Sequence, residues 1–342
     1  MIRVGMIGYG CWGPNLARCV AADPHCQLAA ICDVSSERLL AATRAYPDAR
    51  LERDWHGIVG DPQIDAIVIA TPAALHFEPA CAALGAGKHV LVEKPIAQAV
   101  HEVLALIDMA ERKNLVLMTD HTYVYSPAMR AIRKLVTSGA LGSVRRFNSV
   151  RTNVGTARHD VDVLWDLAAH DLSIIDFLFA APPQAVCATG LSCQSGERQS
   201  RAAMCVYFPD ALVARIRVDW AGPAKIRRIE IAGSNETLIF DDLEPSAKVR
   251  LQTSQTVNGS MDGASIISVE DGEPLSAVIG HLASCIQRRE TPLSDGAAGL
   301  RVVRLLEAAS RSLATAGSVV SMNAEDRFTP IASHEMRSRW PS

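Results

Sequence analysis

The sequence predicts an α/β domain built on a doubly wound parallel sheet, followed by an α+β domain with an open, mostly antiparallel sheet and closing helices. Two observations carry this prediction. Up to about residue 118, short apolar runs alternate with helical stretches, which is typical of strand–helix–strand units. From residue 144 on, strand-like segments follow one another with short turns, and several alternate apolar with polar residues, as in a sheet with one solvated face.

Length and composition limit the classes of protein to consider. A chain of 342 residues exceeds one typical core, so we expect two domains, at 1–121 and 122–342. A net charge of −3 leaves no basic surface for nucleic acid or membranes, and no apolar run is long enough to span a bilayer. The nine cysteines form no C-x-x-C pair, and no signal-peptide pattern precedes the first strand, so we expect a reducing cytoplasm.

The first strand, Val4–Ile7, leads into a glycine-rich turn with the spacing G-x-G-x-x-G, formed by Gly8, Gly10 and Gly13. The first glycine permits a tight turn, the second lets the backbone approach a pyrophosphate, and the third lets strand and helix pack closely. The helix that follows directs free N–H groups at phosphates. The turn therefore predicts a dinucleotide site, which also includes Cys11 and Trp12.

The second strand, Leu28–Cys32, ends in Asp33, twenty positions after Gly13. This is near the distance expected for an acid that binds the cofactor's ribose, although Asp33 could also be a solvated strand end. A carboxylate would repel a 2′-phosphate, so NAD is favoured over NADP. Arg38 lies close to Asp33 in the sequence and could meet a 2′-phosphate, so NADP is kept as the alternative cofactor.

Two further strands, Asp65–Ala70 and His89–Val92, also end in polar residues. Ligands of doubly wound sheets bind at the carboxyl ends of strands, so these residues are expected to line the cofactor cleft. His76 could equally be the polar start of the helix Glu78–Leu84. The expected cofactor contacts at these strand ends are Thr71, Pro72, His76, Glu93 and Lys94.

Lys94 is a candidate acid–base group. Partial burial and a nearby positive charge can lower the pKa of a lysine toward working pH. A surface pair between Lys94 and Glu93 is the alternative. Pro95 makes a cis peptide bond with Lys94 plausible.

In the second domain, Asp166 and His170 are four residues apart, so on a helix they share one face. Together with Lys94 they would suit proton transfer from a secondary hydroxyl. The same spacing also fits a structural hydrogen bond, and two ligands do not make a zinc site.

Further polar side chains are candidates for substrate binding, because an arginine fork can hold a phosphate. The candidate substrate contacts are Lys94, His121, Tyr123, Arg151, Asn153, Arg158, Asp166 and His170.

These motifs together resemble the Gfo/Idh/MocA oxidoreductase family. The matching segments are the Gly8–Gly13 turn, Thr71-Pro72 with His76, Glu93-Lys94-Pro95, and Asp166-x-x-x-His170. The resemblance implies a Rossmann domain before an open sheet whose exposed face forms oligomer contacts, hence a homodimer or homotetramer. It also implies that Lys94 and His170 are the catalytic pair and that Asp166 lies near the substrate.

The expected function is an NAD(P)-dependent dehydrogenase that oxidises a secondary hydroxyl of a sugar, nucleotide sugar or cyclitol to a ketone. The alternatives are an NADPH-dependent ketoreductase of a keto sugar and a non-catalytic NAD-binding regulatory protein. The sequence departs from the common family pattern at Asp120, where glycine is frequent, and at Ser126, where asparagine is frequent. Both departures bear on the identity of the substrate more than on the chemistry.

Overall fold

The computed structural model describes residues 1–155, 160–191, 199–253 and 264–322. These residues form two compact units. The first contains Met1–Tyr125 and Glu273–Val303, and the second contains Ser126–Gly272 together with 304–322.

The first unit is built on a six-stranded parallel sheet. Its strand order is β3-β2-β1-β4-β5-β6, so the order reverses between β1 and β4, which is where doubly wound sheets bind their ligands. The strands are β1 (Ile2–Ile7), β2 (Cys26–Cys32), β3 (Arg50–Glu52), β4 (Ala66–Ile69), β5 (His89–Glu93) and β6 (Leu117–Asp120).

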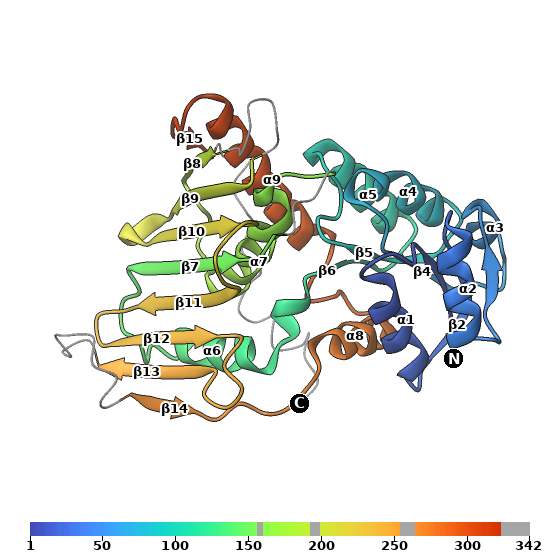
Figure 1. Cartoon of the computed structure of the whole chain (residues 1–342), viewed down its shortest axis with the longest axis horizontal. Helices are drawn as coiled ribbons and strands as arrows, with labels where there is room; N and C mark the ends of the chain where they lie inside the picture. The colour runs from blue at the N-terminus through green and yellow to red at the C-terminus, as the bar shows by residue number, and fades with distance from the viewer. Residues whose placement is uncertain (156–159, 192–198, 254–263, 323–342) are drawn as a thin grey trace. The chain divides into compact units, whose positions relative to one another are not determined.

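Helices lie on both faces of this sheet, which explains why its central strands are almost continuously apolar. Figure 1 shows α4 and α5 side by side, with α1 and α2 across the sheet from them. The helical segments of this unit are α1 (Gly13–Ala22), α2 (Ser36–Ala45), α3 (His56–Val59), η1 (Ala73–Leu75), α4 (Phe77–Gly85), α5 (Val100–Arg112), η2 (Thr122–Tyr125) and α8 (Pro274–Arg288).

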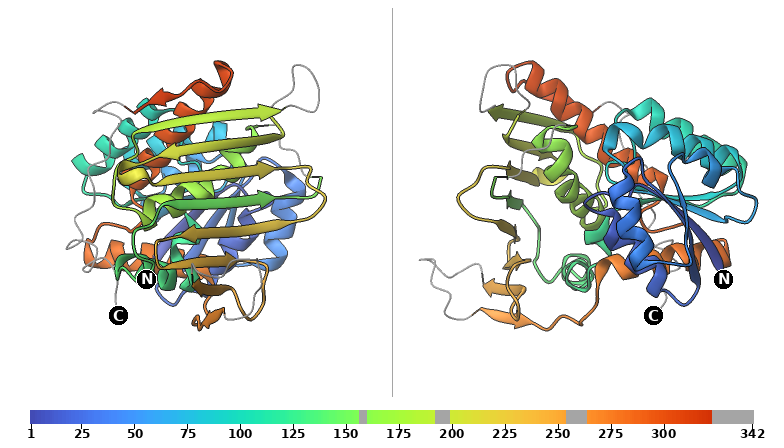
Figure 2. Two further views of the ribbon diagram at one scale, coloured as in Figure 1. Left: turned by 90° about the vertical axis from the view of Figure 1, so that its left-hand side faces the viewer. Right: turned by 45° about the vertical axis from the view of Figure 1, so that its right-hand side comes forward.

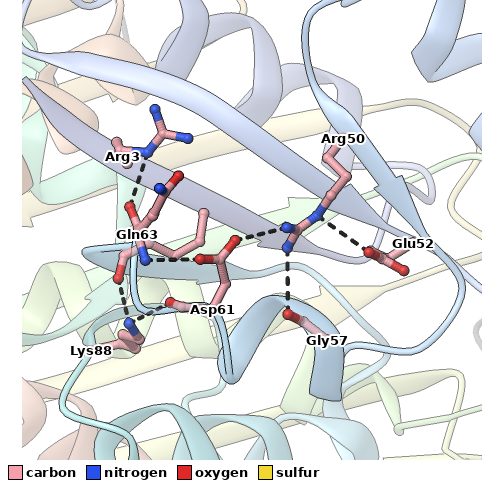
Figure 3. Close-up of polar contacts among 8 residues, drawn as sticks. Arg3, Arg50, Glu52, Gly57, Asp61, Gln63 and Lys88 are labelled. Atoms are coloured by element: carbon pink, nitrogen blue, oxygen red, sulfur yellow. Dashed lines mark hydrogen bonds and ion pairs between the residues drawn. The ribbon is translucent and has the colours of Figure 1, made fainter.

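Polar contacts fasten the loops at the amino ends of the strands (Figure 3). The buried ammonium of Lys88 donates to the carbonyl oxygens of Asp61 and Ile64 at 2.7 and 2.6 Å. The Asp61 carboxylate in turn accepts from Arg50 at 2.7 Å, and Arg3 donates to the Gln63 carbonyl at 3.0 Å. These contacts lie at the strand ends opposite to the predicted cofactor edge.

The second unit is built on a nine-stranded sheet with the order β14-β13-β12-β11-β7-β10-β9-β8-β15. Among the described strands, β7 and β10 run parallel and the other pairs are antiparallel. The strands are β7 (Arg146–Thr152), β8 (Ala185–Leu191), β9 (Arg201–Tyr207), β10 (Val213–Asp219), β11 (Ile226–Ala232), β12 (Glu236–Asp241), β13 (Val249–Thr253), β14 (Ser265–Ile267) and β15 (Val320–Ser321).

One face of this sheet is seen in the left view of Figure 2, with α6 and α7 behind it. Burial alternates along β9, where Ala202, Met204 and Val206 are buried and Arg201 and Ala203 are exposed. This is the pattern of a sheet with one covered face. The helical segments here are α6 (Pro127–Thr137), a π-helical turn η3 (Leu164–Ala168), α7 (Ala169–Leu178) and η4 (Pro209–Ala211), and α9 (Gly296–Ala314) runs from the first unit into the second.

The predicted fold class is confirmed: a parallel α/β sheet is followed by a mostly antiparallel one. The short strands β3, β13, β14 and β15 are additional to the predicted ones. Within the described residues, no helix is both long and apolar enough to cross a membrane.

Candidate active site

The glycine-rich turn after β1 has the geometry that its sequence predicts. Gly8 adopts φ +98°, and a Cβ there would lie 2.6 Å from the Ala70 carbonyl group. A Cβ on Gly13 would lie 2.6 Å from the carbonyl oxygen of Gly8. At Gly10, by contrast, the nearest atom is the Arg38 guanidinium at 3.5 Å. The first and third glycines are therefore required by close packing, and the second keeps one side of the turn open, as a bound pyrophosphate needs.

Asp33 follows β2, and its buried carboxylate holds the turn. It accepts the backbone N–H of Tyr9 at 2.7 Å and that of Ser35 at 2.8 Å. Arg38 Nη1 lies 3.5 Å from its Oδ2. With a side chain only 4% exposed, Asp33 is not a solvated strand end. Carboxylate oxygens have further lone pairs, which leaves acceptor capacity for a ribose diol.

His76 joins the loops that follow β4 and β5. Its Nδ1 lies 2.7 Å from the Pro95 carbonyl oxygen and its Nε2 lies 2.9 Å from that of Thr71. Carbonyl oxygens only accept, so both bonds form at once only on a protonated ring. The side chain is 1% exposed, so His76 fixes the backbone at Thr71 and Pro95. Its direct contact with the cofactor stays a prediction, as do those of Thr71 and Pro72.

Lys94 follows β5 and is half-buried. The Lys94–Pro95 peptide bond is cis, as the sequence analysis anticipated. The Lys94 backbone N–H donates to Glu93 Oε2 at 2.9 Å. The Glu93 carboxyl therefore binds the main chain of Lys94.

His121 and Tyr123 follow β6, where we predicted substrate contacts. His121 is buried, and burial, followed by the positive charges of Arg301 and Lys94, lowers its pKa to about 3. Its imidazole is therefore neutral near pH 7. Tyr123 is half-buried in η2. The substrate contacts of both residues stay predictions.

In the second unit, Asp166 lies in the π-helical turn η3 and His170 in the first turn of α7. The sequence predicts an ordinary helix here. π-helical turns are rare, and those that occur often lie at functional sites. The indole N–H of Trp220, directly after β10, donates to Asp166 Oδ2 at 2.8 Å.

Arg151 is held by a buried acid. Its Nε and Nη2 donate to the two carboxylate oxygens of Asp171, both at 3.1 Å. Ser149 also donates to Asp171, at 2.6 Å. The predicted contact of Arg151 with substrate stays a prediction.

Asn153 is half-buried just after β7, and its backbone N–H donates to the Asp219 carbonyl at 2.8 Å. The predicted substrate contact at Arg158 lies outside the described residues.

Three residues that the sequence analysis did not single out support these elements: Ser149, Asp171 and Trp220. Asp171 adjoins His170 in the sequence, but only the fold shows that its carboxylate turns toward β7. Nothing in the sequence links Trp220 to Asp166, which lies 54 positions earlier. Within the described residues, no group of three or more His, Cys, Asp or Glu side chains could hold a metal ion.

Comparisons with known proteins agree with this geometry. A family model described as "Oxidoreductase family, NAD-binding Rossmann fold" matches residues 2–121, and the model of the GFO/IDH/MocA C-terminal domain matches residues 129–239. The chain is 29% identical over 312 residues to UDP-N-acetylglucosamine 3-dehydrogenase of Acidithiobacillus ferrooxidans, covering 88% of this chain and 94% of the relative. A solved structure of that relative has a TM-score of 0.80 at 26% identity, covering 92% of this chain and 98% of the other.

Two other relatives resemble this chain. An NADP-dependent scyllo-inositol 2-dehydrogenase of Bacillus subtilis is 29% identical over 199 residues, which is 53% of this chain and 52% of the relative. A levoglucosan dehydrogenase solved with NADH and levoglucosan shares the fold, with a TM-score of 0.81 at 22% identity over 94% of this chain and 99% of the other. With both domain models matched in order, and with the glycine-rich turn and Asp33 in place, the chain belongs to the Gfo/Idh/MocA family of oxidoreductases with an NAD-binding Rossmann fold.

Proposed function

We propose that this oxidoreductase uses NAD to oxidise a secondary hydroxyl of a sugar, nucleotide sugar or cyclitol to a ketone. The observation that carries the proposal is the shared carboxyl edge of the parallel sheet. That edge bears the open glycine-rich turn, the buried acid Asp33 and, after β5, Lys94. The relatives named above act on sugars and inositols, which supports this substrate class. Residues 1–121 would serve as the cofactor domain and 122–342 as the substrate domain.

The residues of this edge fit a nicotinamide dinucleotide. The backbone of the turn from Gly8 to Gly13, with Cys11 and Trp12, would hold the pyrophosphate at the start of α1. Asp33 would accept the adenosine ribose hydroxyls. The loops at Thr71 and Glu93 would line the nicotinamide half. When bound, NAD⁺ supplies the hydride acceptor.

His170 would take the hydroxyl proton on an imidazole nitrogen, with Lys94 completing the proton transfer. Asp166, which accepts from Trp220, would orient the imidazole or a substrate hydroxyl. Asn153 and Arg158 would bind the rest of the substrate. Arg151 would also contact the substrate, in addition to its ion pair with Asp171, which ties β7 to the helix that carries His170.

A second candidate is NADPH-dependent reduction of a keto sugar. The Arg38 guanidinium, more than half exposed beside Asp33, could meet a 2′-phosphate there. The NADP-dependent inositol dehydrogenase among the relatives supports keeping this candidate. Dissociation constants for NADH and NADPH separate the two.

The decisive experiment is a screen of sugars, inositols and nucleotide sugars for NADH formation by the purified protein. We expect NADH to form with at least one secondary alcohol of these classes. Tight NADH binding without turnover of any of them would point instead to a non-catalytic NAD-binding regulatory protein. Sedimentation analysis of the same sample tests the proposed homodimer or homotetramer formed through the nine-stranded sheet.

A further inference from the structure

Two acids lie side by side at the carboxyl ends of β5 and β6. Glu93 ends β5, Asp120 ends β6, and the two are opposite each other in the register of these strands. Residues paired in register on adjacent strands carry their side chains on the same face of the sheet, and adjacent strands lie only about 4.8 Å apart. Two carboxylates have acceptors only, so a hydrogen bond between carboxyl groups requires a proton on one of them. Two ionised carboxylates this close in a buried site repel each other, so the arrangement favours a proton on one of them.

The remaining contacts identify Asp120 as the ionised member. Its Oδ1 accepts the Thr122 hydroxyl at 2.7 Å, and its Oδ2 accepts the Trp12 indole N–H at 3.4 Å. Glu93 Oε2 accepts the Lys94 backbone N–H, which leaves the other Glu93 oxygen to carry the proton toward Asp120.

The electrostatics of the pair agree with this assignment. Burial and the neighbouring Asp120 charge raise the pKa of Glu93 well above its ordinary value, against the opposing charge of Lys94. Burial also raises the pKa of Asp120, while hydrogen bonds from Glu93, Thr122 and Trp12 oppose that rise. Cys19 of α1 and Tyr125 of η2 also face the Asp120 charge.

The contact between Trp12 and Asp120 reaches across the sheet edge. Trp12 belongs to the turn after β1, whereas Asp120 ends β6, and β4 and β5 lie between these strands. The indole N–H thus connects the glycine-rich turn to β6. This strand is the neighbour of β5, which leads to Lys94. Trp12 remains 42% exposed, so replacing it leaves the core intact.

We propose that Glu93 and Asp120 work as one proton-sharing carboxyl pair, and that Asp120 is a positioning residue that holds Trp12 and the glycine-rich turn ready for the dinucleotide. The inference rests on the proposed function, because it concerns the same cofactor edge. Without the Asp120 acceptor, the turn loses its anchor at β6. Cofactor binding must then also order the glycine-rich turn, and this cost reduces the free energy gained on binding.

The shared proton is tested without any ligand. A protonated carboxyl group has an infrared carbonyl band that a carboxylate lacks. We expect such a band to persist in the wild-type protein at about pH 8, where ordinary carboxyls are ionised. Glu93→Gln should remove this band. The control is Glu102→Gln, which should keep the band; Glu102 is an acid of the same unit and accepts the Gln98 backbone N–H. A wild-type spectrum without this band, or one unchanged by Glu93→Gln, overturns the proton-sharing pair.

The positioning role is tested by NADH titration, followed through nicotinamide fluorescence. Trp12→Phe keeps the ring and removes the N–H donor, and Asp120→Asn removes the charge. Each is expected to raise the NADH Kd about five- to tenfold, the size of one ordinary hydrogen bond, because the 3.4 Å contact between the indole and the carboxylate is long. Trp55→Phe, at an indole stacked on His56 in the same unit, leaves Kd unchanged.

The outcomes of the two measurements separate the hypotheses. Trp12→Phe with a wild-type Kd overturns the positioning role, even if Asp120→Asn is too unstable to assay. Wild-type protein that binds neither NADH nor NADPH overturns the proposed function, and the infrared measurement still decides whether the carboxyl pair exists.

Discussion

At the residue scale, the cofactor edge is held by side chains that bind the main chain. Asp33 accepts the Tyr9 N–H, His76 lies between two carbonyl oxygens, and Glu93 accepts the Lys94 N–H. Each of these polar groups has a partner inside the fold, so the edge is organised before any ligand arrives. Such preorganisation lowers the ordering cost of binding.

Replacing Lys94 separates chemistry from cofactor binding. Lys94→Ala removes the amine but keeps the backbone N–H that Glu93 accepts, so the loop after β5 retains that contact. We expect kcat to fall at least about 100-fold, the lower range for loss of an acid–base group, with the NADH Kd nearly unchanged. Lys113→Ala, at an exposed lysine of the same unit, is the control. Unchanged turnover in Lys94→Ala would remove this lysine from the mechanism.

Asp33 should set the preference for NAD over NADP. Asp33→Asn keeps the size of the side chain but removes the charge that faces Arg38 and the acceptor pair for a ribose diol. We expect the Kd for NADH to rise about tenfold and the Kd for NADPH to change little or fall, since a 2′-phosphate no longer meets a like charge. Titrations with both cofactors measure the ratio, with Asp48→Asn at an exposed site as the control. A constant ratio would contradict this role.

At the element scale, α7 is joined to β7 by a buried ion pair. Asp171 is fully buried, and its oxygens are bound by Arg151 and Ser149 of the strand. The helix that carries His170 is thereby fixed to the centre of the nine-stranded sheet. Sequence spacing predicts the helix but not this partner, because no local pattern marks which strand residue will face Asp171.

Breaking this pair should destabilise the protein strongly. Arg151→Met leaves a buried carboxylate without its cation, so we expect a loss of about 3–5 kcal/mol in the free energy of unfolding. The double variant Arg151→Met/Asp171→Leu removes both charges and should lose less. Arg201→Met, which breaks a pair whose arginine is 57% exposed, should cost less than Arg151→Met, about 1 kcal/mol. Urea denaturation compares the three, and equal losses in the two single variants would refute the argument.

At the scale of the whole molecule, the two units differ in how far the sequence predicts them. Regular alternation of apolar strands and helices predicts β1, β2, β4, β5 and β6, and G-x-G-x-x-G with Asp33 predicts the cofactor edge. In the second unit, the edge strand β14 and its neighbour β13 are largely exposed or half-exposed and have weak apolar patterns, and the sequence analysis missed both. The contacts Trp220–Asp166 and Arg151–Asp171 depend on the fold bringing distant segments together, so no local signal predicts them.

The buried histidine His121 gives the stability of the molecule a defined pH dependence. An unfolded histidine titrates near pH 6.5, whereas burial and the charges of Arg301 and Lys94 lower the pKa of folded His121 to about 3. Between these values the unfolded chain holds a proton that the folded protein lacks. The contribution of His121 to the free energy of unfolding is therefore complete above about pH 6.5 and is lost as the pH falls toward 3, by at most about 1.4 kcal/mol per pH unit.

Burial also lowers the pKa of His89, so both histidines contribute to the change of wild-type stability with pH. His121→Gln should reduce the slope of unfolding free energy against pH, measured by urea denaturation between about pH 4.5 and 7, whereas His25→Gln, at an exposed histidine, should not. An identical slope in His121→Gln and wild type would mean that folding does not lower the pKa of His121.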